Sequence, residues 1–346
     1  MLHRKSLTLL LASTLLAGLA GTARAEVHVV ASIKPVHSLV AAVMEGVGEP
    51  GLIIEGAGSP HTYALKPSQA QMLEQADLIF WVGHELEAFL EKPLETIGAK
   101  AKTVELLDAP GLVKLGFREG GAFEPHHHGG EAGEQEGEAG HDHDAHETHE
   151  SGHDHPEAEH DHEAGHDHDH AHGAFDAHVW LDPVNAKAMV GEIETALVEA
   201  DPDNGARYHA NAEAVRARLD ALNQEVAQQI EPVRGKGFVV FHDGYQYFEH
   251  RFDIPASGSI TVSPEVLPGA ERIAEIRTRV KELGAACVFA EPQFEPKLVA
   301  TVLEGTQARS GVLDPLGAGL EPGPGLYFEL IRAMSTSLTT CLSQDG

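Results

Sequence analysis

The sequence predicts an α/β protein of two lobes, each a parallel sheet covered by helices, with one long rigid helix joining the lobes and a cleft between them. Short apolar, strand-like runs alternate with helix-like runs in the first part of the chain, and the same alternation returns in the last part. This is the pattern of parallel β-α units. A single long helical pattern separates the two parts.

The first 25 residues predict a secretory signal peptide. A short basic start precedes an apolar run at 6–20, which is shorter than the roughly 20 residues of a membrane-spanning helix. The small residues of "ARA" at 23–25 are typical of a cleavage site, so we expect cleavage after Ala25. No Cys follows the apolar run, which argues against a lipid anchor. We therefore expect an exported, soluble protein.

Residues 26–200 form the predicted N-terminal lobe. Pro at the start of two expected helices supports them, because the first turn of a helix does not need its N–H groups for internal bonding. From Pro183 onward the chain is expected to be helical. The lobe contains expected strands at 27–32, 51–55, 77–82 and 102–107 and expected helices at 35–44, 66–76 and 86–97.

Residues 201–233 form the predicted linker helix, and residues 234–346 form the C-terminal lobe. Apolar side chains in the linker are spaced by four, three, four and four residues from Val215 to Ile230, which places them on one helix face. A helix over 202–230 is about 43 Å long at 1.5 Å per residue. The C-terminal lobe contains expected strands at 237–242, 285–291 and 309–314 and expected helices at 270–284, 296–305 and 325–342.

Residues 118–174 interrupt the N-terminal lobe. They hold 15 of the 24 histidines, and 16 acidic residues with no Lys or Arg lie between 124 and 172. This composition buries too little apolar surface to offset the entropy of ordering, so we expect a disordered insertion. "HEAGH" at 162–166 has the letters of a metalloprotease motif, but it lacks the apolar helix face that would align two imidazoles.

We interpret the insertion as a weak, multisite collector of metal ions rather than a plain linker. Imidazole is mostly neutral at neutral pH and can coordinate a cation, and neighbouring carboxylates add attraction. Flexible ligands lose entropy on binding, so each such site should be weaker than a preformed one. The expected ligands are His126, His127, His128, His141, His143, His153, His155, His166, His168 and His170.

The charge balance favours a cation as the ligand. The net charge is −30, and about half of it lies in the insertion. Such a surface repels nucleic acid and anionic lipid, so partners of these kinds are not expected.

The chain has two cysteines, Cys287 and Cys341. In an exported protein we expect them to form one disulfide. It would close a loop of about 54 residues and contribute at most roughly 4 kcal/mol. Two thiolate metal ligands are the alternative, although zinc thiolate sites typically have a closer spacing.

Three histidines stand near strand ends, where ligands bind in open parallel sheets. His61 follows the second strand, His242 ends the first strand of the C-terminal lobe, and His178 lies where an extended run breaks before a Pro. Glu291 and Asp314 each follow a strand of the C-terminal lobe. Imidazole nitrogens suit zinc, and a carboxylate or a water can complete a tetrahedron. We therefore predict a metal site in the cleft.

Taken alone, any one of these histidines could be an ordinary hydrogen-bonded structural residue. Their shared placement is what supports a ligand set. His84 also follows a strand and is the nearest alternative. The histidines assigned a structural role are His28, His37, His84, His209 and His250.

The chain contains "GSPHTYALKPSQAQMLEQADLIFWVGHELE", "AHVWLDP", "VFHDGYQYFEHRF", "FAEPQFEP" and "GVLDPLG". In order and spacing, these segments resemble the periplasmic zinc-binding (ZnuA-like) subunit of ABC-type zinc importers. The resemblance covers essentially all of 26–346 apart from the insertion. It implies two α/β lobes bridged by a rigid helix, with zinc held between them.

Carried over by position, the resemblance implies that His61, His178 and His242 bind the zinc. Manganese-binding relatives have a carboxylate in place of His242, so a histidine there favours zinc. Cys287 and Cys341 match a disulfide of some zinc-binding members.

The resemblance leaves the fourth ligand open. Some zinc-binding members have Glu directly before the first ligand, where this chain has Pro60. Asp314 matches an acidic ligand of other members, and we take it as the first candidate. Water and Glu291 are the alternatives.

The expected function is capture of Zn²⁺ in the periplasm and its delivery to the membrane permease of an ABC importer. We expect a monomer without enzymatic activity, for which zinc is the transported ligand. A manganese- or iron-binding homologue is the first alternative. A zinc hydrolase, with Glu291 or Asp314 as the base beside a zinc-bound water, is the second. A surface adhesin is the third, and the lack of a lipid anchor disfavours it.

Overall fold

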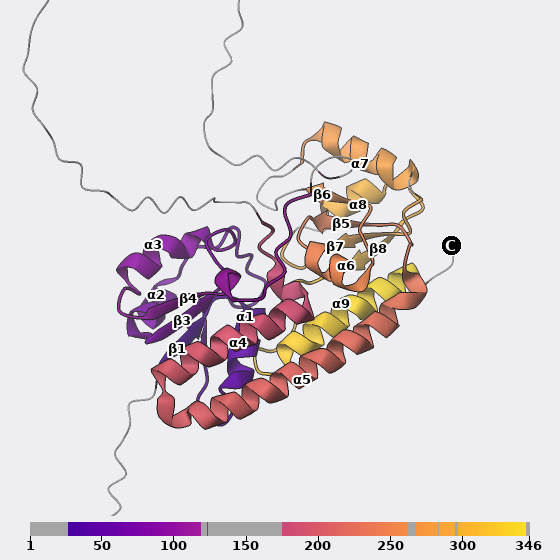
Figure 1. Ribbon diagram of the computed structural model, residues 1–346. Coiled ribbons are helices and arrows are strands. Elements are labelled where there is room, and N and C mark those ends of the chain that lie inside the picture. The colour runs from indigo at the N-terminus through magenta and orange to yellow at the C-terminus, as the bar shows by residue number, and fades with distance from the viewer. Residues whose placement is uncertain are drawn as a thin grey trace, which may run out of the picture.

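The computed structural model describes residues 27–118, 123, 175–261, 268–282, 284–294 and 297–343 (Figure 1). The expected signal peptide, its cleavage after Ala25 and the ten histidines assigned to the insertion lie outside these residues. Among the described helices, none combines the length and the apolar character that a bilayer crossing requires.

The N-terminal lobe is built on a parallel sheet with the strand order β2-β1-β3-β4. The central strands are buried along their whole length, as expected where helices cover both faces of a sheet. The strands are β1 (Val29–Ala31), β2 (Gly51–Leu52), β3 (Leu78–Trp81) and β4 (Lys102–Glu105). The helices that connect them are α1 (Lys34–Val43), α2 (Pro67–Gln75) and α3 (Ala88–Thr96).

The C-terminal lobe repeats this plan with the strand order β6-β5-β7-β8, again parallel throughout. Its strands are β5 (Phe238–His242), β6 (Gly258–Thr261), β7 (Cys287–Ala290) and β8 (Arg309–Val312). Its helices are α6 (Gln246–Phe252), α7 (Ala270–Glu282), α8 (Lys297–Leu303) and α9 (Leu326–Leu342). The elements β6 and α6, which are four and seven residues long, were not predicted from the sequence.

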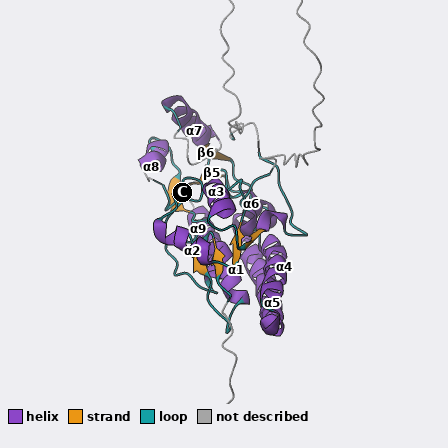
Figure 2. Ribbon diagram, turned by 90° about the vertical axis from the view of Figure 1, so that its left-hand side faces the viewer, coloured by secondary structure: helices purple, strands orange, loops and turns teal. Residues whose placement is uncertain are grey.

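Two long helices, α4 (Pro183–Ala200) and α5 (Gly205–Ile230), lie side by side (Figures 1 and 2). The 26 residues of α5 span about 39 Å at 1.5 Å per residue. This helix contacts α1 and α4 in the N-terminal lobe and α9 beside the C-terminal lobe. Its predicted apolar face is buried. The predicted fold class is confirmed, while the residue boundaries of the lobes stay a prediction.

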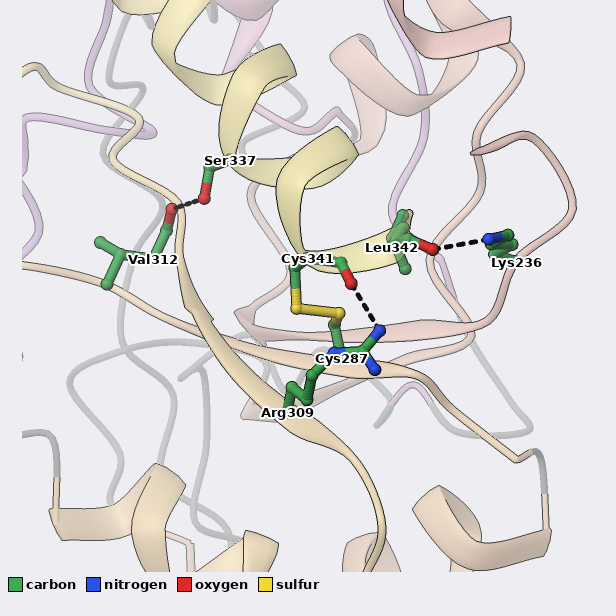
Figure 3. The surroundings of a disulfide bond; sticks show 7 residues. All are labelled: Lys236, Cys287, Arg309, Val312, Ser337, Cys341 and Leu342. Carbon is green, nitrogen blue, oxygen red and sulfur yellow. Dashed lines mark hydrogen bonds between the residues drawn. A yellow bond between two sulfur atoms is a disulfide. The ribbon is translucent and has the colours of Figure 1, made fainter. Parts of the chain in front are cut away.

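A disulfide ties β7 to the end of α9 (Figure 3). The Cα atoms of Cys287 and Cys341 lie 6.3 Å apart. Arg309 on β8 donates a hydrogen bond of 2.6 Å to the carbonyl oxygen of Cys341. The structure has the disulfide that the sequence predicts, rather than the alternative pair of thiolate ligands.

Candidate metal site

Three imidazoles meet between the lobes. His61 lies in the loop after β2, His178 directly precedes a 3-10 turn (Val179–Leu181), and His242 is the last residue of β5. One nitrogen of each ring lies within 4.8 Å of the others, and the Nε2 atoms of His178 and His242 are 3.2 Å apart. Zinc binds imidazole nitrogen at about 2.0–2.1 Å, so one ion between them can contact all three rings after small side-chain shifts.

Buried carboxylates orient two of the rings. His178 donates from Nδ1 to Asp176 over 2.7 Å, and His242 donates from Nδ1 to Glu291 over 2.6 Å. Because the proton sits on Nδ1, the lone pair of each Nε2 faces the space between the rings. This pairing is the usual support of a metal-binding histidine. Glu291 therefore orients the ring of His242, and Asp176 orients that of His178, a contact that was not predicted from the sequence.

The electrostatic surroundings favour neutral, ligating imidazole at one position and charge at another. Burial, together with the neighbouring His178 and His242, lowers the pKa of His61 well below its usual value. Burial also opposes charge on His242, but the contact with Glu291 outweighs it and raises the pKa of that ring. His61 is therefore ready to bind a cation, whereas His242 must release a proton first when the pH is low.

Gly244 keeps the approach to the imidazoles open. A Cβ atom at this position would lie 2.3 Å from Nε2 of His242 and 2.9 Å from Nε2 of His178. Any side chain there would therefore occupy the metal position. The remaining space, lined by the three rings together with Trp180, measures about 10 Å³, which is room for about one water-sized body.

The structure does not bring Asp314 to the three imidazoles. One of its carboxylate oxygens accepts hydrogen bonds from the amides of Leu316 and Gly317, and the other accepts one from Ala318. The side chain of Gln293 also donates to it over 3.0 Å. The carboxylate of Asp314 thus fixes the turn that follows β8.

The histidines assigned a structural role lie apart from this site. His84 belongs to a second group of possible ligands with Glu85 and Glu105, all partly exposed. Its ring nitrogens lie 3.2 and 3.5 Å from the two carboxylates, which is ion-pair geometry. His37 contacts the carbonyl oxygen of Pro50 at 3.0 Å.

Several polar contacts connect the lobes around the site. Arg118, where the insertion begins, pairs with Asp243 and Glu249 of the C-terminal lobe. Asp182, which caps α4, forms two hydrogen bonds of 2.7 Å with Arg251 on α6. The contact with Arg118 fixes the position of Asp243, which directly follows His242. Together, these contacts limit how far the two lobes can separate.

Two lobes joined by a long helix, with three convergent imidazoles between them, are the features of a two-lobed metal-binding protein. Residues 29–341 match the ZnuA family, described as zinc-uptake complex component A, periplasmic. The chain belongs to this family, which confirms the resemblance seen in the sequence.

The similarity extends over whole proteins. The high-affinity zinc uptake system protein ZnuA of Brucella suis biovar 1 is 54% identical over 339 residues, covering 97% of this chain and 98% of that protein. The protein of the same name from Yersinia pestis is 36% identical and covers 92% of each. A zinc-bound crystal structure of a ZnuA deletion variant shares the fold, with a TM-score of 0.66 at 22% identity over 92% of this chain and 99% of that one.

Proposed function

We propose that the protein captures one Zn²⁺ ion between its lobes in the periplasm and delivers it, as a monomer, to the membrane permease of an ABC importer. The observation that carries the proposal is the convergence of three imidazoles from both lobes. Membership of the zinc-uptake family supports the same cargo. The two relatives are named as high-affinity zinc uptake proteins.

The donor set favours zinc over manganese or iron. Nitrogen-rich sites prefer the later divalent metals, whereas manganese prefers oxygen ligands. We propose water as the fourth ligand, because Asp314 is bonded to backbone amides and Glu291 to His242. Zinc is the cargo in this proposal rather than a catalytic ion, because Glu291 and Asp314, the two possible bases of a hydrolase, are bonded to His242 and to backbone amides.

A competition titration tests the cargo. Full-length protein is titrated with Zn²⁺ against a chromogenic chelator, and the titration is repeated with Mn²⁺ present in excess. We expect one tight zinc that a hundredfold excess of Mn²⁺ does not displace. Displacement by Mn²⁺ would favour the manganese-binding alternative.

Delivery and processing are tested separately. Permease reconstituted in vesicles should accelerate the release of zinc from the loaded protein, and vesicles without permease serve as the control. An unchanged release rate would contradict the proposed delivery of zinc to the permease.

Cleavage of the signal peptide is tested by N-terminal sequencing of the exported protein. The sequence should begin at Glu26 if cleavage follows Ala25.

A further inference from the structure

Lys34, the first residue of α1, is a buried cation whose partners belong to the other lobe. The residue is only 5% exposed. Its Nζ donates to the carbonyl oxygens of Gly317 and Ala318, each over 3.0 Å, and of Leu320 over 2.9 Å. An ammonium group has three N–H donors, so these carbonyls satisfy all of them. Burying a charge is costly without such partners.

The turn at 314–320 is therefore held from two edges. Lys34 binds its carbonyl oxygens from the N-terminal lobe, and Asp314 binds the amides of Leu316, Gly317 and Ala318 from within the turn. With donors and acceptors both engaged, the turn has little freedom to shift while Lys34 stays in place.

This turn forms one wall of the metal site. Pro315 and Leu316 line the same small space as the three imidazoles. The carbonyl oxygen of Pro315 accepts a hydrogen bond of 2.9 Å from Trp180, whose ring lies 5.2 Å from that of His178 between centroids. Moving the turn away from α1 would therefore open the metal position to water.

We propose that Lys34 is a positioning residue that holds the 314–320 turn closed over the metal and thereby slows the release of zinc. The proposal rests on the proposed function. Opening the turn breaks three hydrogen bonds to a charged donor at once, and such bonds are stronger than those between neutral groups. The same opening of the turn precedes both the entry and the release of zinc, so Lys34 is expected to slow both steps.

A stopped-flow experiment tests this role. Full-length protein carrying one equivalent of Zn²⁺ is mixed with excess chromogenic chelator, and the slow phase reports the site between the lobes. We expect Lys34→Met to accelerate this phase about tenfold. Lys236→Met is the matched control, because Lys236 donates to the carbonyl oxygen of Leu342 within the C-terminal lobe (Figure 3).

Four outcomes distinguish the proposed role of Lys34 from the alternatives. Release from Lys34→Met no faster than from Lys236→Met would overturn the proposal. Lys34→Arg, which keeps the charge, should restore most of the slow release, whereas a general loss of stability would not follow charge in this way. If Lys34→Met does not fold, Asp314→Asn takes its place, because this substitution weakens the bonds to the amides at the other edge of the turn. A zinc release rate from Asp314→Asn equal to that of the wild type would contradict the proposal. A wild type without a slow phase contradicts the proposed function as well.

Discussion

The described part of the chain contains two groups of possible metal ligands that differ in their surroundings. His178 and His242 are 7% and 3% exposed, and the space between the three imidazoles is about 10 Å³. The side chains of His84, Glu85 and Glu105 are 25%, 22% and 27% exposed, and they line a cavity of about 420 Å³.

Residue type alone does not make a metal site, because the surroundings of the side chains decide whether an ion can bind. In the first group, carboxylates take the Nδ1 protons of His178 and His242 and leave both Nε2 atoms facing a space of atomic size. In the second group, both ring nitrogens of His84 face carboxylates. The three side chains line a cavity that is large enough to hold many water molecules. Only the first group is preorganised for a dehydrated ion.

The largest expected effect comes from filling the space between the imidazoles. Gly244→Ala should weaken zinc binding by roughly 100-fold, because the added methyl overlaps Nε2 of His242 and overpacking costs up to about 3 kcal/mol. Chelator competition measures the affinity. Gly191→Ala is the control, since its new Cβ would meet only Arg216 at 3.7 Å. Unchanged affinity in Gly244→Ala would show that zinc binds elsewhere.

Removing the carboxylate behind an imidazole should have a smaller effect. Glu291→Gln and Asp176→Asn should each weaken zinc binding by about tenfold, because Nδ1 loses its anionic acceptor while the shape is kept. Isothermal titration with Zn²⁺ gives the affinity. Glu95→Gln, at the cavity beside His84, removes the same charge elsewhere and should leave the affinity unchanged. An equal loss of zinc affinity in all three variants would show that the effect comes from the change in net charge alone.

Deleting 126–172 tests the insertion against the preformed site. The shortened protein should keep the tight zinc with its affinity changed less than about twofold, because the three imidazoles of the proposed site lie outside the deleted segment. It should lose weaker binding events in the same titration. Loss of the tight event would make the insertion the principal site.

The smallest effect is expected at the second group of ligands. His84→Ala should change the affinity for the tight zinc by less than about twofold, since its contacts with Glu85 and Glu105 lie outside the three-imidazole site. Equilibrium dialysis with radioactive zinc measures both the affinity and the number of bound ions. If His84→Ala bound one ion fewer than the wild type, the second group would also be a zinc site, and the difference between the two groups would be contradicted.

The sequence predicted the parts of the molecule that depend on local pattern. The strand at 237–242 and the apolar face of α5 follow from the spacing of apolar residues. The placement of His242 follows from its position at a strand end. The same strand-end argument pointed to Asp314 as a ligand. However, Asp followed by Pro, with Gly two residues further on, is also a turn signal, and the carboxylate of Asp314 binds the amides of the turn.

The remaining features depend on contacts that no local pattern records. Gly244 is required because two imidazoles from different segments approach its Cα, one of them 66 positions away in the sequence. Lys34 meets carbonyls more than 280 residues downstream. Asp176 had a weak signal, since it stands two residues before His178, where a carboxylate can reach Nδ1 of the ring.

The most direct test of the three-imidazole site is a zinc titration of the full-length double variant His61→Ala/His242→Ala beside the wild type. The double variant should lose the tightest binding event and keep only weak events of the kind expected from exposed histidines. Retention of the wild-type affinity for the first zinc would contradict the assignment of the ion to the space between the lobes.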